Sequence, residues 1–163
     1  MEKKIFILVL IFILVACSNH SAYELPITKY PQSFQEEVSK LPEDIRDKMK
    51  VPTKFPFNVA FFRFSITPVY ASVEYEPVDG ELSDKVNLIF TTYYNDKIDS
   101  PKSYESIELS NGEKAILKKD EEELKVLEWA DDGDVQQLAV MFRETKVTNE
   151  ELKMMADSLI TVK

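Results

Sequence analysis

The sequence predicts an α+β fold in which a single antiparallel sheet of about 5–7 strands carries N-terminal and C-terminal helices packed on it. Short segments of alternating apolar and polar residues fill the middle of the chain, and turn signals separate them. Helical periodicity is confined to the two ends of the chain. A length of 163 residues suits one domain, and no internal repeat or second domain is visible.

The first helical region is expected over residues 32–49, with an interruption at Pro42. Its apolar residues recur with helical spacing on one face: Phe34, Val38 and Leu41. Ser33 and Glu36 have the spacing of a capping box, so Ser33 is the expected N-cap. Two prolines within residues 52–56 then force the chain to be extended.

The expected strands cover residues 57–66, 69–75, 86–94, 104–109, 115–117, 124–129 and 135–142. Asn111-Gly112 is the strongest hairpin signal in the chain. The last helix has Thr148 as its N-cap, with Glu151 closing a capping box. Its apolar face comprises Leu152, Met155, Ala156 and Leu159.

The start of the chain has the pattern of a secretory signal peptide. Lys3 and Lys4 precede an apolar run that begins at Ile5 and ends in the sequence Leu14-Val15-Ala16-Cys17, which holds the only cysteine. One alternative is a retained membrane-spanning helix, but such a helix needs roughly 20 apolar residues, and polar residues follow Cys17. A second alternative is an ordinary cleaved signal peptide in which Cys17 stands by chance.

The sequence Leu14-Val15-Ala16-Cys17 resembles the lipobox of bacterial lipoproteins. The resemblance implies cleavage between Ala16 and Cys17, a diacylglycerol on the Cys17 sulfur, and often a further acyl group such as palmitate on the new N-terminus. Two or more acyl chains anchor a protein stably. We therefore expect a signal peptide at 1–16, a lipidated Cys17 and tether at 17–30, and one domain at 31–163, on the extracytoplasmic face of the cell membrane.

The C-terminal half also resembles a domain-of-unknown-function family of Gram-positive bacteria. The residues that carry this resemblance run from Asn111-Gly112 through Leu127-Glu128-Trp129 and Gly133 to the terminal helix segments Glu150-Glu151-Leu152 and Ala156-Asp157-Ser158-Leu159. Lys54-Phe55-Pro56-Phe57 is similar to the segment that leads into the first strand of that family. The resemblance implies an extracytoplasmic location at the cell envelope, and it supplies no reaction and no catalytic residues.

Composition argues against several function classes. His20 is the only histidine and lies in the expected tether, which excludes Ser-His-Asp and Cys-His catalysis and multi-histidine metal sites within this chain. The acidic residues around Gly133 lack the spacing of a calcium loop, and no phosphate-binding glycine loop is present. A formal net charge of −9 disfavours nucleic acid as a partner. We expect no metal, no cofactor and no enzymatic activity.

Aromatic residues carry the one binding hypothesis that the sequence offers. Phe61, Phe62, Tyr93 and Tyr94 are the candidate residues of a groove for a glycan, a peptide or a lipid. Other rings could join them or form the core instead: Phe55, Phe57, Phe64, Tyr104 and Trp129. The expected function is a non-enzymatic binding or regulatory module that contacts an envelope protein or glycan. The alternatives are a partner of a membrane protein and a carboxylate-based envelope hydrolase with two carboxyl groups in one cleft.

Overall fold

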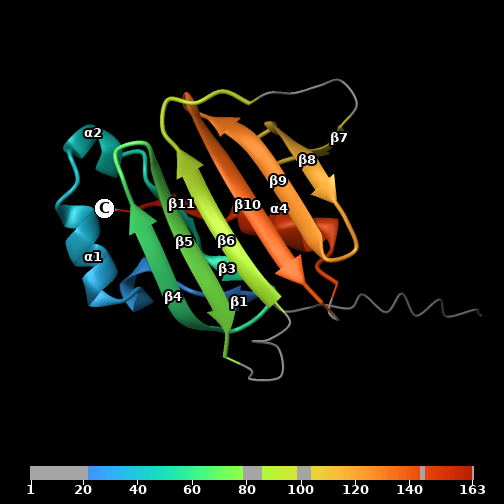
Figure 1. Ribbon diagram of the computed structural model, residues 1–163, viewed down its shortest axis with the longest axis horizontal. Helices are drawn as coiled ribbons and strands as arrows, with labels where there is room; N and C mark the ends of the chain where they lie inside the picture. The colour runs from blue at the N-terminus through green and yellow to red at the C-terminus, as the bar shows by residue number, and fades with distance from the viewer. Residues whose placement is uncertain (1–21, 79–85, 99–103, 144–145, 163) are drawn as a thin grey trace, which may run out of the picture.

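The structure is a computed structural model that describes residues 22–78, 86–98, 104–143 and 146–162, without the side chains of Phe61 and Phe62. Its main sheet has seven strands in the order β4-β5-β6-β10-β9-β8-β7, and every neighbouring pair is antiparallel (Figure 1). The strands are β4 (Val59–Ile66), β5 (Tyr70–Pro77), β6 (Val86–Tyr93), β7 (Glu105–Glu108), β8 (Lys114–Asp120), β9 (Leu124–Asp131) and β10 (Asp134–Phe142).

The prediction of an α+β fold with an antiparallel sheet is confirmed, whereas the prediction of a single sheet is wrong. β1 (Tyr23–Glu24) pairs with β3 (Lys54–Phe55), and β2 (Lys50–Pro52) pairs with β11 (Leu159–Thr161), which adds two small antiparallel sheets. Strands of two or three residues are too short to show alternation, so the sequence gives no sign of them. Leu159, expected on the terminal helix, is the first residue of β11.

The helical elements lie at the two ends of the described chain, as predicted. They are the 3₁₀ turn η1 (Ile27–Lys29), α1 (Gln32–Ser39), α2 (Glu43–Arg46) and α4 (Asn149–Asp157). Pro42 separates α1 from α2. Thr148 and Glu151 form the expected capping box of α4. The expected cap of α1 is wrong, because the helix begins at Gln32, Pro31 is its N-cap residue, and Ser33 lies inside the first turn.

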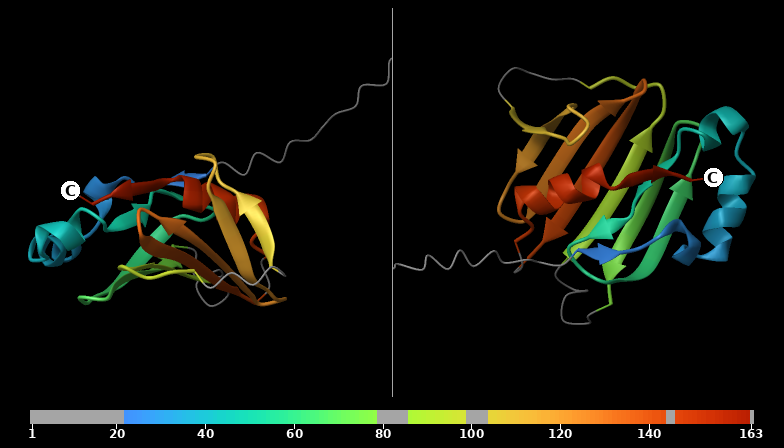
Figure 2. Two further views of the ribbon diagram at one scale, coloured as in Figure 1. Left: turned by 90° about the horizontal axis from the view of Figure 1, so that it is seen from above. Right: turned by 180° about the vertical axis from the view of Figure 1, so that it is seen from behind.

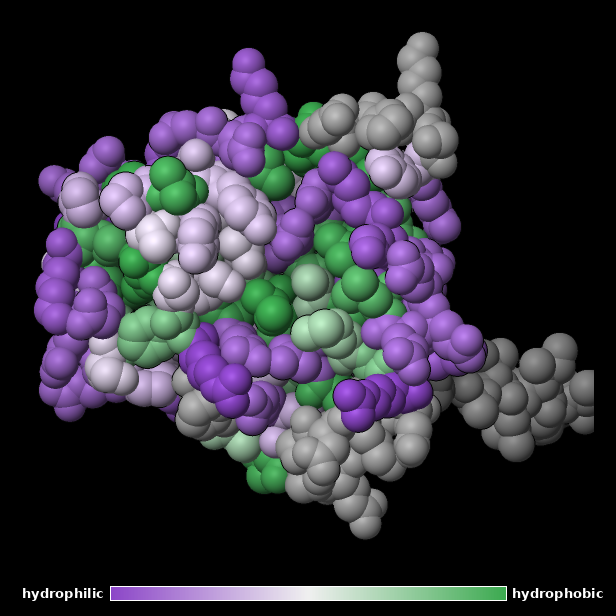
Figure 3. Space-filling view, in the orientation of Figure 1, coloured by the Kyte–Doolittle hydropathy of each residue, from purple (hydrophilic) through white to green (hydrophobic). Residues whose placement is uncertain are grey.

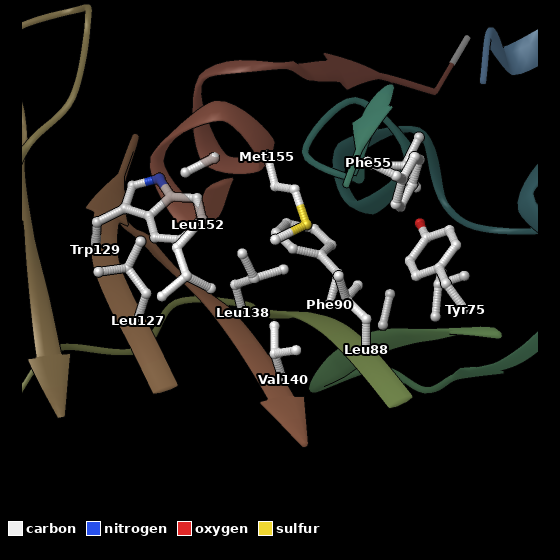
Figure 4. Close-up of a cluster of buried hydrophobic side chains, with 14 of the residues drawn as sticks. Phe55, Tyr75, Leu88, Phe90, Leu127, Trp129, Leu138, Val140, Leu152 and Met155 are labelled. Atoms are coloured by element: carbon white, nitrogen blue, oxygen red, sulfur yellow. The ribbon is translucent and has the colours of Figure 1, made fainter. Parts of the chain in front are cut away.

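The main sheet curves around α4, which lies on its concave face together with the small sheets (Figure 2). Alternation in β5 and β6 directs Val73, Leu88 and Phe90 to this face, where each is at most 1% exposed. Leu152 and Met155 of α4 point from the other side into the same cluster (Figure 4). Burial of this apolar surface is the main stabilising term of the fold.

The segment expected to be a tether is part of the folded domain from Tyr23 onwards. The backbone N–H of Leu25 donates to the carbonyl of Thr53 at 2.8 Å, beside the pairing of β1 with β3. Tyr30 is 3% exposed, and its hydroxyl donates to the carbonyl of Pro52 and lies 3.0 Å from the Tyr75 hydroxyl. The boundary expected at residue 31 is therefore too late, because apolar side chains of residues 25–30 pack on the core.

Candidate functional site

The candidate site lies on the convex face of the main sheet, which no described helix or strand covers. Figure 3 shows this face, with apolar residues gathered near its middle and hydrophilic residues around them. Sheet register places Ile89, Ala139 and Val126 side by side across β6, β10 and β9, and all three are half-buried. A one-sided covering of this kind leaves a surface that can serve in recognition.

Ion pairs and hydrogen bonds occupy much of the rest of this uncovered face. Arg63 lies 3.6 Å from Glu74 and 3.1 Å from Glu76. Glu128 receives a hydrogen bond from Gln137 at 2.8 Å and pairs with Lys118 at 3.0 Å. Such exposed or half-exposed pairs contribute little stability individually. They do fix the orientation of charged groups around the apolar centre.

Two tyrosines stand next to each other at one end of the uncovered face. Tyr70 of β5 and Tyr93 of β6 are opposite one another in the sheet, and their ring centroids are 6.2 Å apart. Tyr93 also pairs with Val135 of β10, which pairs with Ala130 of β9. The pKa of Tyr93 is raised, first by partial burial and then by the negative charges of Glu128 and its other neighbours. The phenol therefore stays neutral at physiological pH and can donate a hydrogen bond.

Beside this pair lies an open groove of about 930 Å³. Its walls are the segment from Asn95 to Ile98 on one side and Tyr104 with β8 on the other, and Ala130 and Ile116 contribute apolar surface. The ring of Tyr104 is 42% exposed and has the Lys118 ammonium 5.9 Å from its centroid. We call Tyr70, Tyr93, Tyr104 and this groove the tyrosine end of the sheet. Apolar surface with a few convergent polar groups is typical of ligand sites.

A buried carboxylate holds the groove segment in place. Asp134 is 2% exposed and accepts hydrogen bonds from the backbone N–H of Asn95 at 2.8 Å and from the Lys48 ammonium at 3.3 Å. Asn95 has a positive φ of 53°, a conformation that asparagine tolerates better than most residues. Lys48 also donates to the Asn95 side chain at 3.1 Å. These contacts pre-organise the turn that follows Tyr94.

The four aromatic candidates from the sequence separate into three groups. Tyr93 lies on the uncovered face, next to the groove but not among the residues that line it. Tyr94 is a core residue, because it is 6% exposed, and its hydroxyl has no hydrogen-bond partner among the described residues. Burial and the nearby Asp134 charge raise the pKa of Tyr94 to about 12. The side chains of Phe61 and Phe62 lie outside the described part, although their backbone belongs to β4.

The remaining aromatics divide between core and surface. Phe55, Phe57 and Trp129 are at most 6% exposed and belong to the core. Phe64 packs edge-on against Phe34 of α1, with ring centroids 5.3 Å apart. The sequence pattern does not single out Tyr70, because only the register of β5 with β6 places it beside Tyr93.

Carboxylates gather in a second, smaller pocket of about 380 Å³ between the β7–β8 turn and α4. Asp131 is ion-paired with Lys50. Asp157 accepts hydrogen bonds from the backbone N–H and the hydroxyl of Ser110, at 2.7 and 2.6 Å, and pairs with Lys153 at 3.2 Å. Partial burial alone would raise the pKa of Asp157, but the Ser110 hydrogen bonds and Lys153 outweigh it, and the pKa is lowered. An ionised, paired carboxylate cannot serve as the general acid of a glycosidase.

Within the described ranges, no group of three metal-binding side chains is close enough to hold an ion. The same ranges contain no helix that is long and apolar enough to span a bilayer. Ala16, Cys17 and His20 lie outside the described residues, so the structure does not bear on them. No family model matches the chain, and no curated protein or solved structure is significantly similar to it.

Proposed function

We propose that this protein is a bacterial lipoprotein that is held at the extracytoplasmic face of the cell membrane by lipid on Cys17. The observation that carries the proposal is the sequence Leu14-Val15-Ala16-Cys17 at the end of a short apolar run. A diacylglycerol together with a further acyl chain gives stable anchoring. Tyr23 lies in a strand only six residues after Cys17, which suits a domain that works close to the membrane.

The anchored domain acts as a binding or regulatory module, and the tyrosine end is its contact surface for an envelope glycan or protein. Partly exposed tyrosine rings provide apolar area and a hydroxyl at little entropic cost. The groove beside them adds donors and acceptors from Asn95, Lys97 and Ser106. The carboxylate-based hydrolase remains the alternative, and the ion pairs of Asp131 and Asp157 argue against it.

The anchor is tested by metabolic labelling of cells that express the full chain with a tagged fatty acid. Wild-type protein takes up label and stays in the membrane fraction, whereas Cys17→Ser loses the label and is released or left unprocessed. Ser18→Ala is the matched control and keeps the label. Unchanged labelling of the Cys17→Ser variant, or an intact mass that retains residues 1–16 and an unmodified sulfur, would disprove the assignment.

The contact surface is tested with detergent-solubilised full chain and purified envelope fractions. The double change Tyr70→Ala and Tyr93→Ala is expected to reduce co-sedimentation at least about tenfold, because loss of two aromatic contacts removes more than about 1.4 kcal/mol. Ile160→Ala is the control, since Ile160 is 37% exposed but belongs to β11. Equal binding by all three proteins would place the contact elsewhere. Hydrolysis of an envelope polymer that Asp157→Asn abolishes would replace binding by catalysis.

A further inference from the structure

We infer that the domain rests on the lipid surface through one corner, formed by Tyr23 and Val78, and that the tyrosine end points away from the membrane. The inference rests on the proposed lipidation of Cys17. To the proposed anchor it adds a second contact with the outer leaflet of the membrane. It also gives the domain an orientation relative to that membrane. Two observations carry it. The stretch of chain between Cys17 and the first described residue is short, and two exposed apolar side chains lie where the described chain begins.

The length of chain limits how far the start of the domain can be from the lipid. From Cys17 to Ala22, the first described residue, there are five residue steps, which span at most about 18 Å at ~3.3–3.6 Å each. A strand of eight residues such as β5 is roughly 26 Å long at ~3.3 Å per residue. The start of the domain is therefore kept near the membrane, while the opposite end of the sheet can stand a full strand length away.

Both exposed side chains lie at the end of the sheet where the chain enters the domain. Tyr23 of β1 is opposite Phe55 of β3, three residues before Asn58. The backbone N–H of Val78, just after β5, donates to the Asn58 carbonyl at 2.7 Å. Figures 1 and 2 both show β1 and the end of β5 near the same end of the sheet.

Exposure and chemistry suit these two residues to the membrane interface. Tyr23 is 49% exposed and Val78 is 54% exposed, although both are apolar over most of their side chains. Tyrosine is favoured at the level of the lipid headgroups because its ring is apolar and its hydroxyl is polar. Lys54 of β3, which is exposed and lies opposite Glu24 of β1, can pair with lipid phosphates.

Exposed carboxylates oppose contact of another part of this end with an anionic membrane. The turn Glu121–Glu123 between β8 and β9 lies at the same end, because the N–H of Phe142 at the end of β10 donates to the Glu123 carbonyl. All three glutamates are exposed. Anionic headgroups repel them over a distance of about 10 Å at ordinary ionic strength. The acidic turn is therefore expected to lie off the lipid surface.

Val69 and Val78 provide a matched pair for the test, since they flank β5 at its two ends and are 64% and 54% exposed. Val78→Cys or Val69→Cys is introduced into the full lipidated chain, where the Cys17 sulfur is already blocked. Each variant is labelled with an environment-sensitive fluorophore and reconstituted into vesicles of phosphatidylcholine with a minor share of phosphatidylglycerol. Lipids that carry a spin label on the headgroup then act as quenchers.

Quenching at position 78 is expected to exceed that at position 69 by at least about threefold, because the quencher acts only over short distances. Adding Tyr23→Asp is expected to reduce quenching at position 78 while the protein still sediments with the vesicles. Equal quenching at the two positions, or stronger quenching at position 69, overturns the orientation and leaves the anchor intact. Failure of the full chain to sediment with vesicles overturns the anchor itself, and this inference with it.

Discussion

Tyr94 shows how much a single buried hydroxyl can matter. The residue is 6% exposed, and its hydroxyl has no hydrogen-bond partner among the described residues. An unsatisfied buried donor costs about 1–3 kcal/mol. We expect Tyr94→Phe to raise the free energy of unfolding by about 1 kcal/mol in urea titration at neutral pH. Tyr93→Phe, at a partly exposed site, should change it little, and a destabilised Tyr94→Phe variant would show that the hydroxyl has a partner.

Trp129 is the largest of the fully buried side chains, at 1% exposed, and its ring lies 6.3 Å from that of Phe90. Truncation of a buried aromatic removes apolar contact and leaves a cavity. Trp129→Ala is therefore expected to cost about 3–5 kcal/mol, measured by chemical denaturation. Tyr104→Ala, at a residue that is 42% exposed, serves as the surface control. A Trp129→Ala variant as stable as this control would contradict the buried position.

Buried tyrosines also set the alkaline limit of stability. The pKa of Tyr94 is raised to about 12, and burial raises the pKa of Tyr30 and Tyr75 further. A folded-state pKa above the unfolded value of ~10 means that the folded form binds the proton more tightly. Stability is then fully present below pH ~10 and is lost as the pH rises towards 12 and beyond. Thermal midpoints across this range should fall steeply, and less steeply for Tyr94→Phe.

Among the elements, α4 depends on its capping box. The backbone N–H of Glu151 donates to the Thr148 hydroxyl at 3.1 Å, and the backbone N–H of Thr148 donates to the Glu151 carboxylate at 2.8 Å. Thr148→Ala removes the first of these and should cost about 1 kcal/mol, measured by urea titration. Thr148→Ser keeps the oxygen and should stay close to wild type. Equal losses for the two variants would mean that the methyl group, and not the cap, is responsible.

The sequence could predict the elements whose pattern repeats over several residues. Alternation over eight residues identifies β5 and β6, and the Thr148–Glu151 spacing identifies the start of α4. β1, β2, β3 and β11 could not be predicted, because two or three residues give no period. Ser33 satisfies the spacing rule for a cap, but Pro31 occupies that place, because α1 starts at Gln32.

The candidate site could be predicted only in part. The sequence identified Tyr93 and Tyr94 as neighbours, but alternation places adjacent residues on opposite faces and does not say which face is covered. Tyr70 lies 23 residues before Tyr93 and meets it only through the register of β5 with β6. The register of two strands depends on which face of the sheet is covered and on the geometry of the turns. The alternation pattern within one strand specifies neither.

At the scale of the whole molecule, excess negative charge opposes compactness. The formal net charge is −9, and many of the carboxylates are exposed. Salt screens this self-repulsion, so moderate NaCl should raise the thermal midpoint relative to low ionic strength. Glu122→Lys, at an exposed position in the acidic turn, should reduce the dependence on salt. A midpoint that falls with added salt would show that favourable ion pairs, such as Lys118–Glu128, dominate instead.

The position of Tyr23, which lies in a strand only six residues after Cys17, limits how far the domain can reach from the membrane. With a lipid on Cys17, the link and one strand length together give a ceiling of roughly 45 Å above the bilayer. Under that proposal, a ligand farther than this from the bilayer is out of reach. A partner that is also held at the membrane would meet the domain by lateral diffusion, and this confinement would raise their effective concentration.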